Sequence, residues 1–505
     1  MAKPGAANQT TDATMHVSYN RTVSPADFAA NADLLATWLD RLAASGVSKP
    51  RYFSPFNEPD TSWKSGQNLA QQHAAFARAV ALRLRSDHPD VFVSGPCTSW
   101  PYPGENWRRW QPDGWERAFI EQTGDVAGAY DFHFYTKEFW AYGKESPGFK
   151  TELRQPTPNL HASLWTGHHQ MLDFGKGEAL LDLAQSLHLA KWGRPSPPVI
   201  ISEFGRQGIT PQLGSWANDY LSYLYGTTVT RLWMMFMDRP EVALTVPFIL
   251  PVSDAGYGSK RGQALYSRPG APDDLTPHVT PLRDFIGFFR DLEGERVPAA
   301  WTGLDPRQSV GVFTIATRRG DTLFVLLHTA AATPLAFDLR LSADASPVGT
   351  IQRMRWEGPV PVDHRAPTPP DARWRRDLSG TEPLASPRLE LAAEETALLR
   401  LALVAPATRQ VVVTRHYAPE NLRALAADRP AAFTFTLPAG EQAAIAELVL
   451  TFAAPAGGHA GQRLALTLND TALATRPDLG LLEGWKHPVH PFRVPVPAAL
   501  LRPGA

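Results

Sequence analysis

The stretch PPVIISEFG at residues 197–205 is a short apolar run that ends on a carboxylate, Glu203. Proline and glycine bound it, as they commonly bound a strand buried on both faces of a parallel sheet. A second stretch, RYFSPFNEPD at residues 51–60, likewise passes from a predicted strand, residues 51–55, into a carboxylate, Glu58. Both carboxylates therefore lie where parallel strands end.

The first half of the chain alternates such strands with amphipathic stretches, a pattern that predicts an α/β fold with a parallel sheet. Further strands are expected at residues 90–95, 131–136, 198–203 and 230–237. One helix is expected to begin at Ser24-Pro25, and another to cover residues 68–86 with His73 on its apolar face.

Past residue 300, short alternating runs separated by Gly, Pro and Asp indicate β-sandwiches. We therefore expect a (β/α)8 TIM-type barrel over residues 1–298 and β-sandwich domains at 299–404 and 405–505, the second truncated. Because the family resemblance described below makes the strand before Glu58 the fourth, it implies that the first three barrel strands are missing and that residues 51–55 form an open edge. An unusually short barrel is the alternative.

Composition excludes several classes of partner. The chain of 505 residues has 49 Lys and Arg against 50 Asp and Glu, without long charged runs, so nucleic acid and anionic membranes are not expected partners. Its single cysteine, Cys97, cannot form an internal disulfide. No apolar run is long enough to span a membrane, and the polar N-terminal segment has no signal-peptide core.

Two carboxylates at the ends of buried strands suit glycoside hydrolysis, which needs one acid to protonate the leaving oxygen and one carboxylate at the anomeric carbon. If each glutamate is considered alone, the simplest interpretation is that Glu58 is a solvated loop residue and that Glu203 is a charged residue at the end of a strand. Together, at the ends of parallel strands with two further predicted strands between them, they predict a catalytic pair.

Asn57-Glu58-Pro59 and the segment IISEFG at residues 200–205 resemble the strand-four and strand-seven signatures of clan A retaining glycoside hydrolases. The resemblance implies that Glu58 is the general acid/base, that Glu203 is the nucleophile and that Asn57 holds the sugar 2-hydroxyl.

The clan also has a His-x-Tyr at strand six and a Trp at strand eight. Here these would be His133 and Tyr135, the latter orienting Glu203, and Trp233. Without the two glutamates, the simplest interpretation of His133, Tyr135 and Trp233 would be that they are core residues.

Within the clan, NEPD, SEFG, the segment TPLRDFIGFFRDLEGERV at residues 280–297 and the trailing β-rich blocks are most similar to the β-agarases and β-porphyranases of glycoside hydrolase family 86. The resemblance implies an endo-acting enzyme on agarose or porphyran, secreted or periplasmic. Another clan A β-glycanase or β-glycosidase, and a carbohydrate-binding fragment without turnover, remain alternatives.

Eleven of the 15 tryptophans precede residue 240, and loop indoles could stack on sugar rings. The candidates lie in three loops: Trp63 after Glu58; Trp100, Tyr102, Trp107 and Trp110 after the strand expected at 90–95; and Trp140 and Trp165 after the strand expected at 131–136. The cations Lys64, Arg108 and Arg109 could meet a sulfated sugar, although such side chains are usually only solvated.

No cofactor or metal is predicted. His168 and His169 are adjacent and lack helical metal-ligand spacing, and no glycine-rich phosphate loop is present.

Overall fold

The computed structural model describes the greater part of the chain. The described residues are 10–16, 22–63, 68–99, 101–102, 107–137, 176–207, 215–253, 263–267, 278–290, 292–297, 299, 301, 312–329, 334–341, 345–357, 373–403, 414–420, 423–426, 429–440, 446–453, 458–482 and 489–502.

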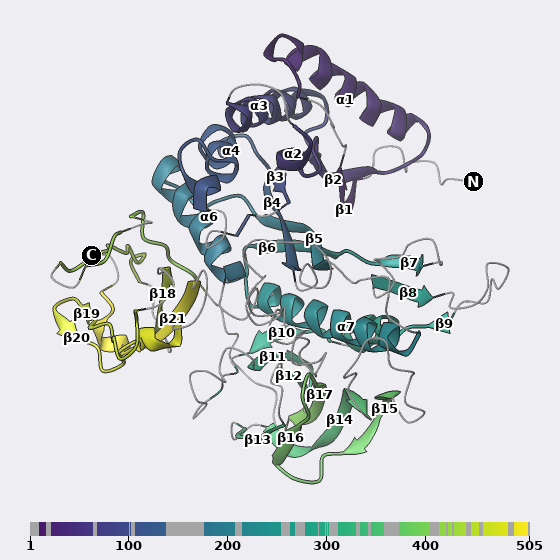
Figure 1. Ribbon diagram of the computed structural model, residues 1–505, viewed down its shortest axis with the longest axis vertical. Coiled ribbons are helices and arrows are strands. Elements are labelled where there is room, and N and C mark those ends of the chain that lie inside the picture. Colours follow the sequence, from purple (N-terminus) through teal and green to yellow (C-terminus); the bar gives the residue numbers. More distant parts are fainter. Residues whose placement is uncertain are drawn as a thin grey trace.

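A curled six-stranded parallel sheet, with strands in chain order from β1 to β6, forms the centre of the N-terminal half (Figure 1). It fits part of a TIM-type barrel, as the alternation of strands and helices predicts. Its strands are β1 (Thr10–His16), β2 (Lys49–Ser54), β3 (Phe92–Thr98), β4 (Ala129–Lys137), β5 (Val199–Gln207) and β6 (Val242–Pro247).

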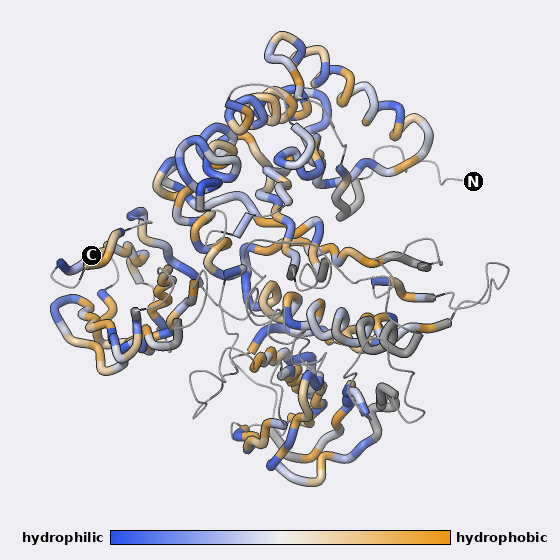
Figure 2. Tube along the Cα trace, in the orientation of Figure 1, coloured by the Kyte–Doolittle hydropathy of each residue, from blue (hydrophilic) through white to orange (hydrophobic). Residues whose placement is uncertain are grey.

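Helices connect successive strands and pack against the sheet. They are η2 (Pro25–Asp27), α1 (Phe28–Ala44), α2 (Pro59–Ser62), α3 (Leu69–Asp87), η3 (Trp107–Trp110), α4 (Trp115–Thr123), α6 (Lys176–Trp192) and α7 (Ser215–Met237). Figure 2 shows apolar and polar residues alternating around α1, whose Leu35 and Leu39 are buried. The helices expected from Ser24-Pro25 and over residues 68–86 are both confirmed.

Two strand predictions were wrong. Residues 230–237 are the last two turns of α7 and not a strand; the next strand is β6. A short apolar run such as residues 230–237 fits a helix and a strand equally well, so its pattern cannot distinguish the two. Residues 51–55 are not a sheet edge either, because β1 pairs with β2.

Three short strands and a helix follow the parallel sheet: β7 (Leu250–Ser253), β8 (Ala264–Ser267), β9 (His278–Val279) and α8 (Pro281–Phe289). The expected β-rich region begins after them. Its main sheet has the order β10-β11-β12-β17-β14-β15, beside a two-stranded β13-β16 sheet. These strands are β10 (Glu295–Val297), β11 (Val312–Arg319), β12 (Thr322–Thr329), β13 (Leu335–Asp338), β14 (Ala345–Glu357), β15 (Arg373–Pro383), β16 (Arg388–Leu391) and β17 (Thr396–Leu403).

Helix α7 contacts this sheet directly: the Tyr223 hydroxyl donates to the Glu394 carbonyl at 2.8 Å and the Tyr223 ring packs on Trp356.

The last block contains short strands and 3-10 turns: β18 (Ala446–Ala453), β19 (Thr467–Leu468), β20 (Thr471–Ala472), η6 (Leu479–Leu482), β21 (Val489–Val496) and η7 (Ala498–Leu500). They pair as β18-β21 and β19-β20. The β-rich character is confirmed, but the described strands do not establish β-sandwiches, and the boundaries at 298 and 404 stay predictions. No helix in the described part of the chain is long and apolar enough to cross a membrane.

The turn after β2 is anchored by Asp60, whose side chain is almost fully buried. One carboxylate oxygen accepts the Ser99 backbone N–H at 2.9 Å, and the other accepts the Ser99 hydroxyl at 2.5 Å and a hydrogen bond from Arg109. Arg109 also pairs with the buried Glu116, which accepts the Thr98 hydroxyl at 2.5 Å. This network ties the turn that carries Glu58 to β3 and α4.

Asp60→Asn should loosen this anchor, because it removes a buried negative charge and leaves Arg109 with an incomplete set of acceptors. We expect a loss of roughly 3 kcal/mol in the free energy of unfolding, measured by urea denaturation. Asp113→Asn, the same substitution at an exposed position, should change it by less than about 0.5 kcal/mol. Equal losses in the two variants would contradict the role of Asp60.

His73 is fully buried on α3, with its ring centroid 4.0 Å from that of Phe56 and next to Trp115. Among the described residues neither ring nitrogen has a hydrogen-bond partner. Burial lowers the pKa of His73 to about 3, although Asp60 opposes the shift. The folded protein therefore holds a neutral imidazole at pH values where the unfolded chain binds a proton.

His73 should consequently make the protein less stable in acid. Below pH 6.5 the unfolded state takes up a proton that the folded state refuses until about pH 3, so stability falls by up to about 1.4 kcal/mol per pH unit. In His73→Phe this component should vanish, as measured by the difference in unfolding free energy between variant and parent from pH 7 to 4. Phe76→Leu, a control on the same buried face, should give a difference that is constant with pH.

Candidate active site

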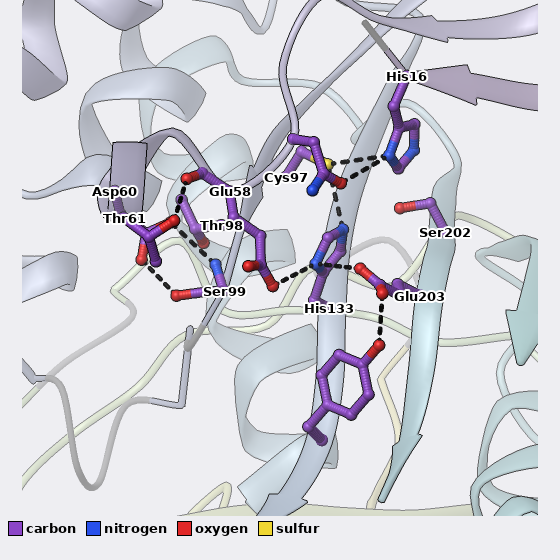
Figure 3. A network of polar contacts seen from close by, with 12 residues as sticks. His16, Glu58, Asp60, Thr61, Cys97, Thr98, Ser99, His133, Ser202 and Glu203 are labelled. Atoms are coloured by element: carbon purple, nitrogen blue, oxygen red, sulfur yellow. Dashed lines mark hydrogen bonds and ion pairs between the residues drawn. The ribbon is translucent and has the colours of Figure 1, made fainter. Parts of the chain in front are cut away.

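The carboxyl ends of β1 to β5 bring together polar side chains from five separate segments (Figure 3). Glu58 follows β2, Cys97 lies on β3, His133 on β4 and Glu203 on β5, while His16 ends β1. Parallel strands end at one edge of the sheet, so residues far apart in the sequence meet there.

The two predicted glutamates converge on one atom, Nδ1 of His133. This nitrogen lies 3.1 Å from Oε1 of Glu58 and 3.0 Å from Oε2 of Glu203. The three atoms lie within 4.8 Å of one another. The His133 ring is fully buried, whereas the two carboxylates are 24% and 18% exposed, so they form the accessible surface of the cluster.

Glu58 is held in an uncommon backbone conformation. Its φ of 48° lies in the left-handed region, which costs a non-glycine residue about 1 to 3 kcal/mol. Its N–H donates to the Cys97 carbonyl at 2.9 Å, and its own carbonyl accepts the backbone N–H of Thr61 at 3.0 Å. These bonds and the following Pro59, which begins α2, fix the point at which the chain turns away from the strand.

Glu203 is stabilised as an anion. The Tyr135 hydroxyl donates to its Oε1 at 2.5 Å, and His133 contacts the other oxygen. Burial alone would raise the pKa of Glu203, but these two donors outweigh burial and hold the pKa below its usual value. Burial and the neighbouring carboxylate raise the pKa of Tyr135, so its hydroxyl stays a proton donor.

Behind the glutamates lie two histidines and the only cysteine. Cys97 Sγ is 3.2 Å from Nε2 of His133 and 3.7 Å from Nδ1 of His16. Burial lowers the pKa of each histidine, yet Cys97 and the neighbouring carboxylates outweigh it, raising the pKa of His16 to about 11 and that of His133 well above its usual value. The two histidines in turn lower the pKa of Cys97 against the effect of burial.

Asn57 joins this cluster through His16, whose Nδ1 lies 3.1 Å from the Asn57 side-chain oxygen. On the far side of the same ring, Nε2 forms an ion pair with Asp131 at 3.5 Å. The other oxygen of Asp131 accepts the Ser202 N–H at 3.2 Å. His16 therefore links the residue before Glu58 to the residues that precede His133 and Glu203.

Among the predicted substrate-binding residues, Asn57, His133 and Tyr135 lie with the two glutamates, but Trp63 does not offer a stacking face. It is only 2% exposed and packs against Phe56 and His73 in the core. Trp233 lies on helix α7 and not on a strand, because residues 230–237 continue that helix; its indole donates to the Thr245 hydroxyl at 3.1 Å.

Of the other loop residues predicted to contact the sugar, some are buried, one is exposed, and the rest lie outside the described residues. Tyr102 and Trp110 are fully buried, and Arg109 is engaged by Asp60 and Glu116. Arg108 is exposed. Trp100, Lys64, Trp140, Trp165, His168, His169 and the side chain of Trp107 lie outside the described residues.

Three members of the site were not predicted from the sequence: His16, Cys97 and Asp131. His16 ends a polar strand, TTDATMH, which has no apolar alternation to predict it. Asp131 could have been found, because it lies two residues before His133 on a predicted strand and so shares its face. Among the residues that the structure describes, two groups could hold a metal ion: His16, Cys97 and His133, and Glu58, His133 and Glu203.

Comparison with known proteins shows which fold this site belongs to. No family model and no curated protein matches the sequence. Among solved structures, a GH86 protein in complex with neoagarooctaose matches with a TM-score of 0.67 at 19% identity, over 91% of this chain and 68% of that one.

A β-porphyranase of glycoside hydrolase family 86 from the human gut bacterium Bacteroides plebeius matches with a TM-score of 0.65 at 16% identity, over 98% of this chain and 81% of that one. The resemblance to family 86 inferred from the sequence is therefore confirmed at the level of the fold, which this chain shares with these two proteins.

Proposed function

We propose that the chain is a retaining glycoside hydrolase in which Glu203 is the nucleophile and Glu58 the general acid/base. The observation that carries this proposal is the convergence of both carboxylates on Nδ1 of His133, with the contacting atoms within 4.8 Å. Retaining enzymes place their carboxyl groups about 5 to 5.5 Å apart, whereas inverting enzymes leave room for a water between them.

The roles follow from the surroundings of each carboxylate. Glu203 accepts hydrogen bonds from Tyr135 and His133 and has a lowered pKa, so it is ionised near neutral pH and suited to attack the anomeric carbon. Glu58 would then donate the proton to the leaving oxygen. In the second step Glu58 would take a proton from the water that cleaves the glycosyl ester at Glu203.

Asn57 is suited to bind the sugar next to the scissile bond. Its side-chain oxygen is engaged by His16, an arrangement that leaves the amide nitrogen, a donor, for a sugar hydroxyl. A bond to the 2-hydroxyl strengthens in the transition state and so contributes to rate.

The substrate we propose is a β-linked galactan of the agar type, agarose or porphyran, cleaved within the chain. Support comes from the fold shared with the protein crystallised with neoagarooctaose and with the β-porphyranase, and from the motifs NEPD and SEFG. Another clan A β-glycanase would use the same two glutamates. The buried positions of Trp63 and Trp110 remove two indoles from the predicted subsites.

Substitution of each glutamate should separate the two roles. Glu203→Gln should lower turnover by about three orders of magnitude or more on every substrate, because no glycosyl ester can form. Glu58→Ala should spare aryl glycosides with good leaving groups, and azide should accelerate it and yield a glycosyl azide of retained configuration. Glu121→Gln, on the outer side of α4, is the matched control and should act like the parent.

Near-normal activity of Glu203→Gln would refute the nucleophile assignment. Products of inverted anomeric configuration, detected by nuclear magnetic resonance immediately after hydrolysis, would refute the retaining mechanism.

A substrate panel tests the galactan proposal. We expect reducing ends to be released from agarose or porphyran, with oligosaccharides of several lengths appearing early because cleavage is internal. Xylan and aryl glucosides serve as comparison substrates. Activity on these alone would reject the galactan assignment and keep the two glutamates, whereas galactan binding without release of reducing ends would support a binding protein.

A further inference from the structure

We propose that His16, Cys97 and His133 form a binding site for one thiophilic divalent cation, Zn²⁺, directly behind the two glutamates. Three strands contribute one ligand each: β1, β3 and β4. The thiol, Nδ1 of His16 and Nε2 of His133 all lie within 4.8 Å of one another. Figure 3 shows both rings directed toward the cysteine.

The spacing of these atoms matches tetrahedral zinc. With Zn–S near 2.3 Å and Zn–N near 2.0 Å, neighbouring ligands of a tetrahedral site lie about 3.5 Å apart. The observed distances from Sγ to the two ring nitrogens are 3.2 and 3.7 Å. A cation could therefore be bound with only small side-chain adjustments.

The far nitrogen of each ring already has the partner that a metal-bound histidine usually has. Nε2 of His16 faces Asp131 at 3.5 Å, and Nδ1 of His133 faces the carboxylates of Glu58 and Glu203. A carboxylate on the far side keeps the N–H there and directs the opposite nitrogen toward the metal. Both rings are thus oriented with the near nitrogen toward the sulfur.

The three near atoms require positive charge between them. A thiolate and two imidazole nitrogens are all lone-pair donors, so either protons or a cation must lie between them. When Zn²⁺ binds, the protons held at these atoms pass to solvent and three metal–ligand bonds form, with no change in oxidation state. Because Cys97 is the only cysteine of the chain, the thiolate is committed to this site.

The fourth position and the entry path lie at His16. Its side chain is 18% exposed, whereas Cys97 and His133 are fully buried. The Asn57 side-chain oxygen, 3.1 Å from Nδ1 of His16, is placed to complete the coordination, and otherwise water can do so. Solvent therefore cannot reach the site past Cys97 or His133, and a cation would enter past His16.

The test is titration of chelator-treated protein with Co²⁺, an optical stand-in for Zn²⁺, followed by Zn²⁺. We expect one Co²⁺ per chain, a thiolate-to-cobalt charge-transfer band and visible bands of tetrahedral intensity, all removed by equimolar Zn²⁺. Cys97→Ser should lose the charge-transfer band and bind at least 100-fold more weakly. His16→Gln should bind roughly 10- to 100-fold more weakly and keep the band. His73→Phe, which removes a histidine elsewhere, should bind like the parent.

The proposal is overturned if the parent protein shows no charge-transfer band. It is also overturned if Cys97→Ser binds cobalt like the parent, because the ion would then lie at Glu58 and Glu203. If Cys97→Ser fails to fold, alkylation of the parent thiol decides: Zn²⁺ should slow it at least 10-fold, and an unchanged rate overturns the site. These readouts measure binding alone, so they are independent of the proposed hydrolase activity.

Discussion

The contact of one buried imidazole with two carboxylates is the interaction on which the site depends. His133 is fully buried, and its Nδ1 contacts both Glu58 and Glu203. Two carboxylates this close repel each other unless a donor lies between them. The raised pKa of His133 keeps that donor present, so the histidine allows the pair to lie side by side while one of them stays ionised.

The position of His133 follows from the pleat of β4. Asp131, His133 and Tyr135 alternate with Phe132 and Phe134, so the polar residues share one face and the phenylalanines pack on the other. In the pairing with β5, His133 lies opposite Glu203. The single segment DFHFY thus supplies the partner of His16, the donor to both glutamates and the hydroxyl that holds the nucleophile.

This alternation explains how much the sequence could predict. The strands before Glu58 and Glu203 were found because apolar runs between turn residues have a clear signature, whereas His133 and Tyr135 were named only because the resemblance to clan A implies a His-x-Tyr at strand six. The strand β1 was missed because its residues are polar and its pairing with β2 is settled only by the fold. Trp63 was misjudged for a related reason: an indole in a loop sequence can still be buried, and only packing against Phe56 decides it.

Two residues with strained backbone lie beside the buried charged groups of the site. Glu58 and Cys97 both have left-handed backbone angles, with φ values of 48° and 59°, and the N–H of the first donates to the carbonyl of the second. Such conformations persist only where surrounding contacts determine them. Here the contacts are Asp60 with Ser99 and Arg109 on one side and His133 on the other.

The aromatic core beneath, with His73 packed among Phe56, Trp63 and Trp115, offsets this cost with buried apolar surface. The residues that stabilise the fold therefore differ from those that form the site, and the hydrogen bonds of Asp60 connect the two groups. Trp63 belongs to the first group, and its backbone N–H donates to the Pro59 carbonyl at 2.8 Å, so it joins the turn that carries Glu58 to the aromatic core.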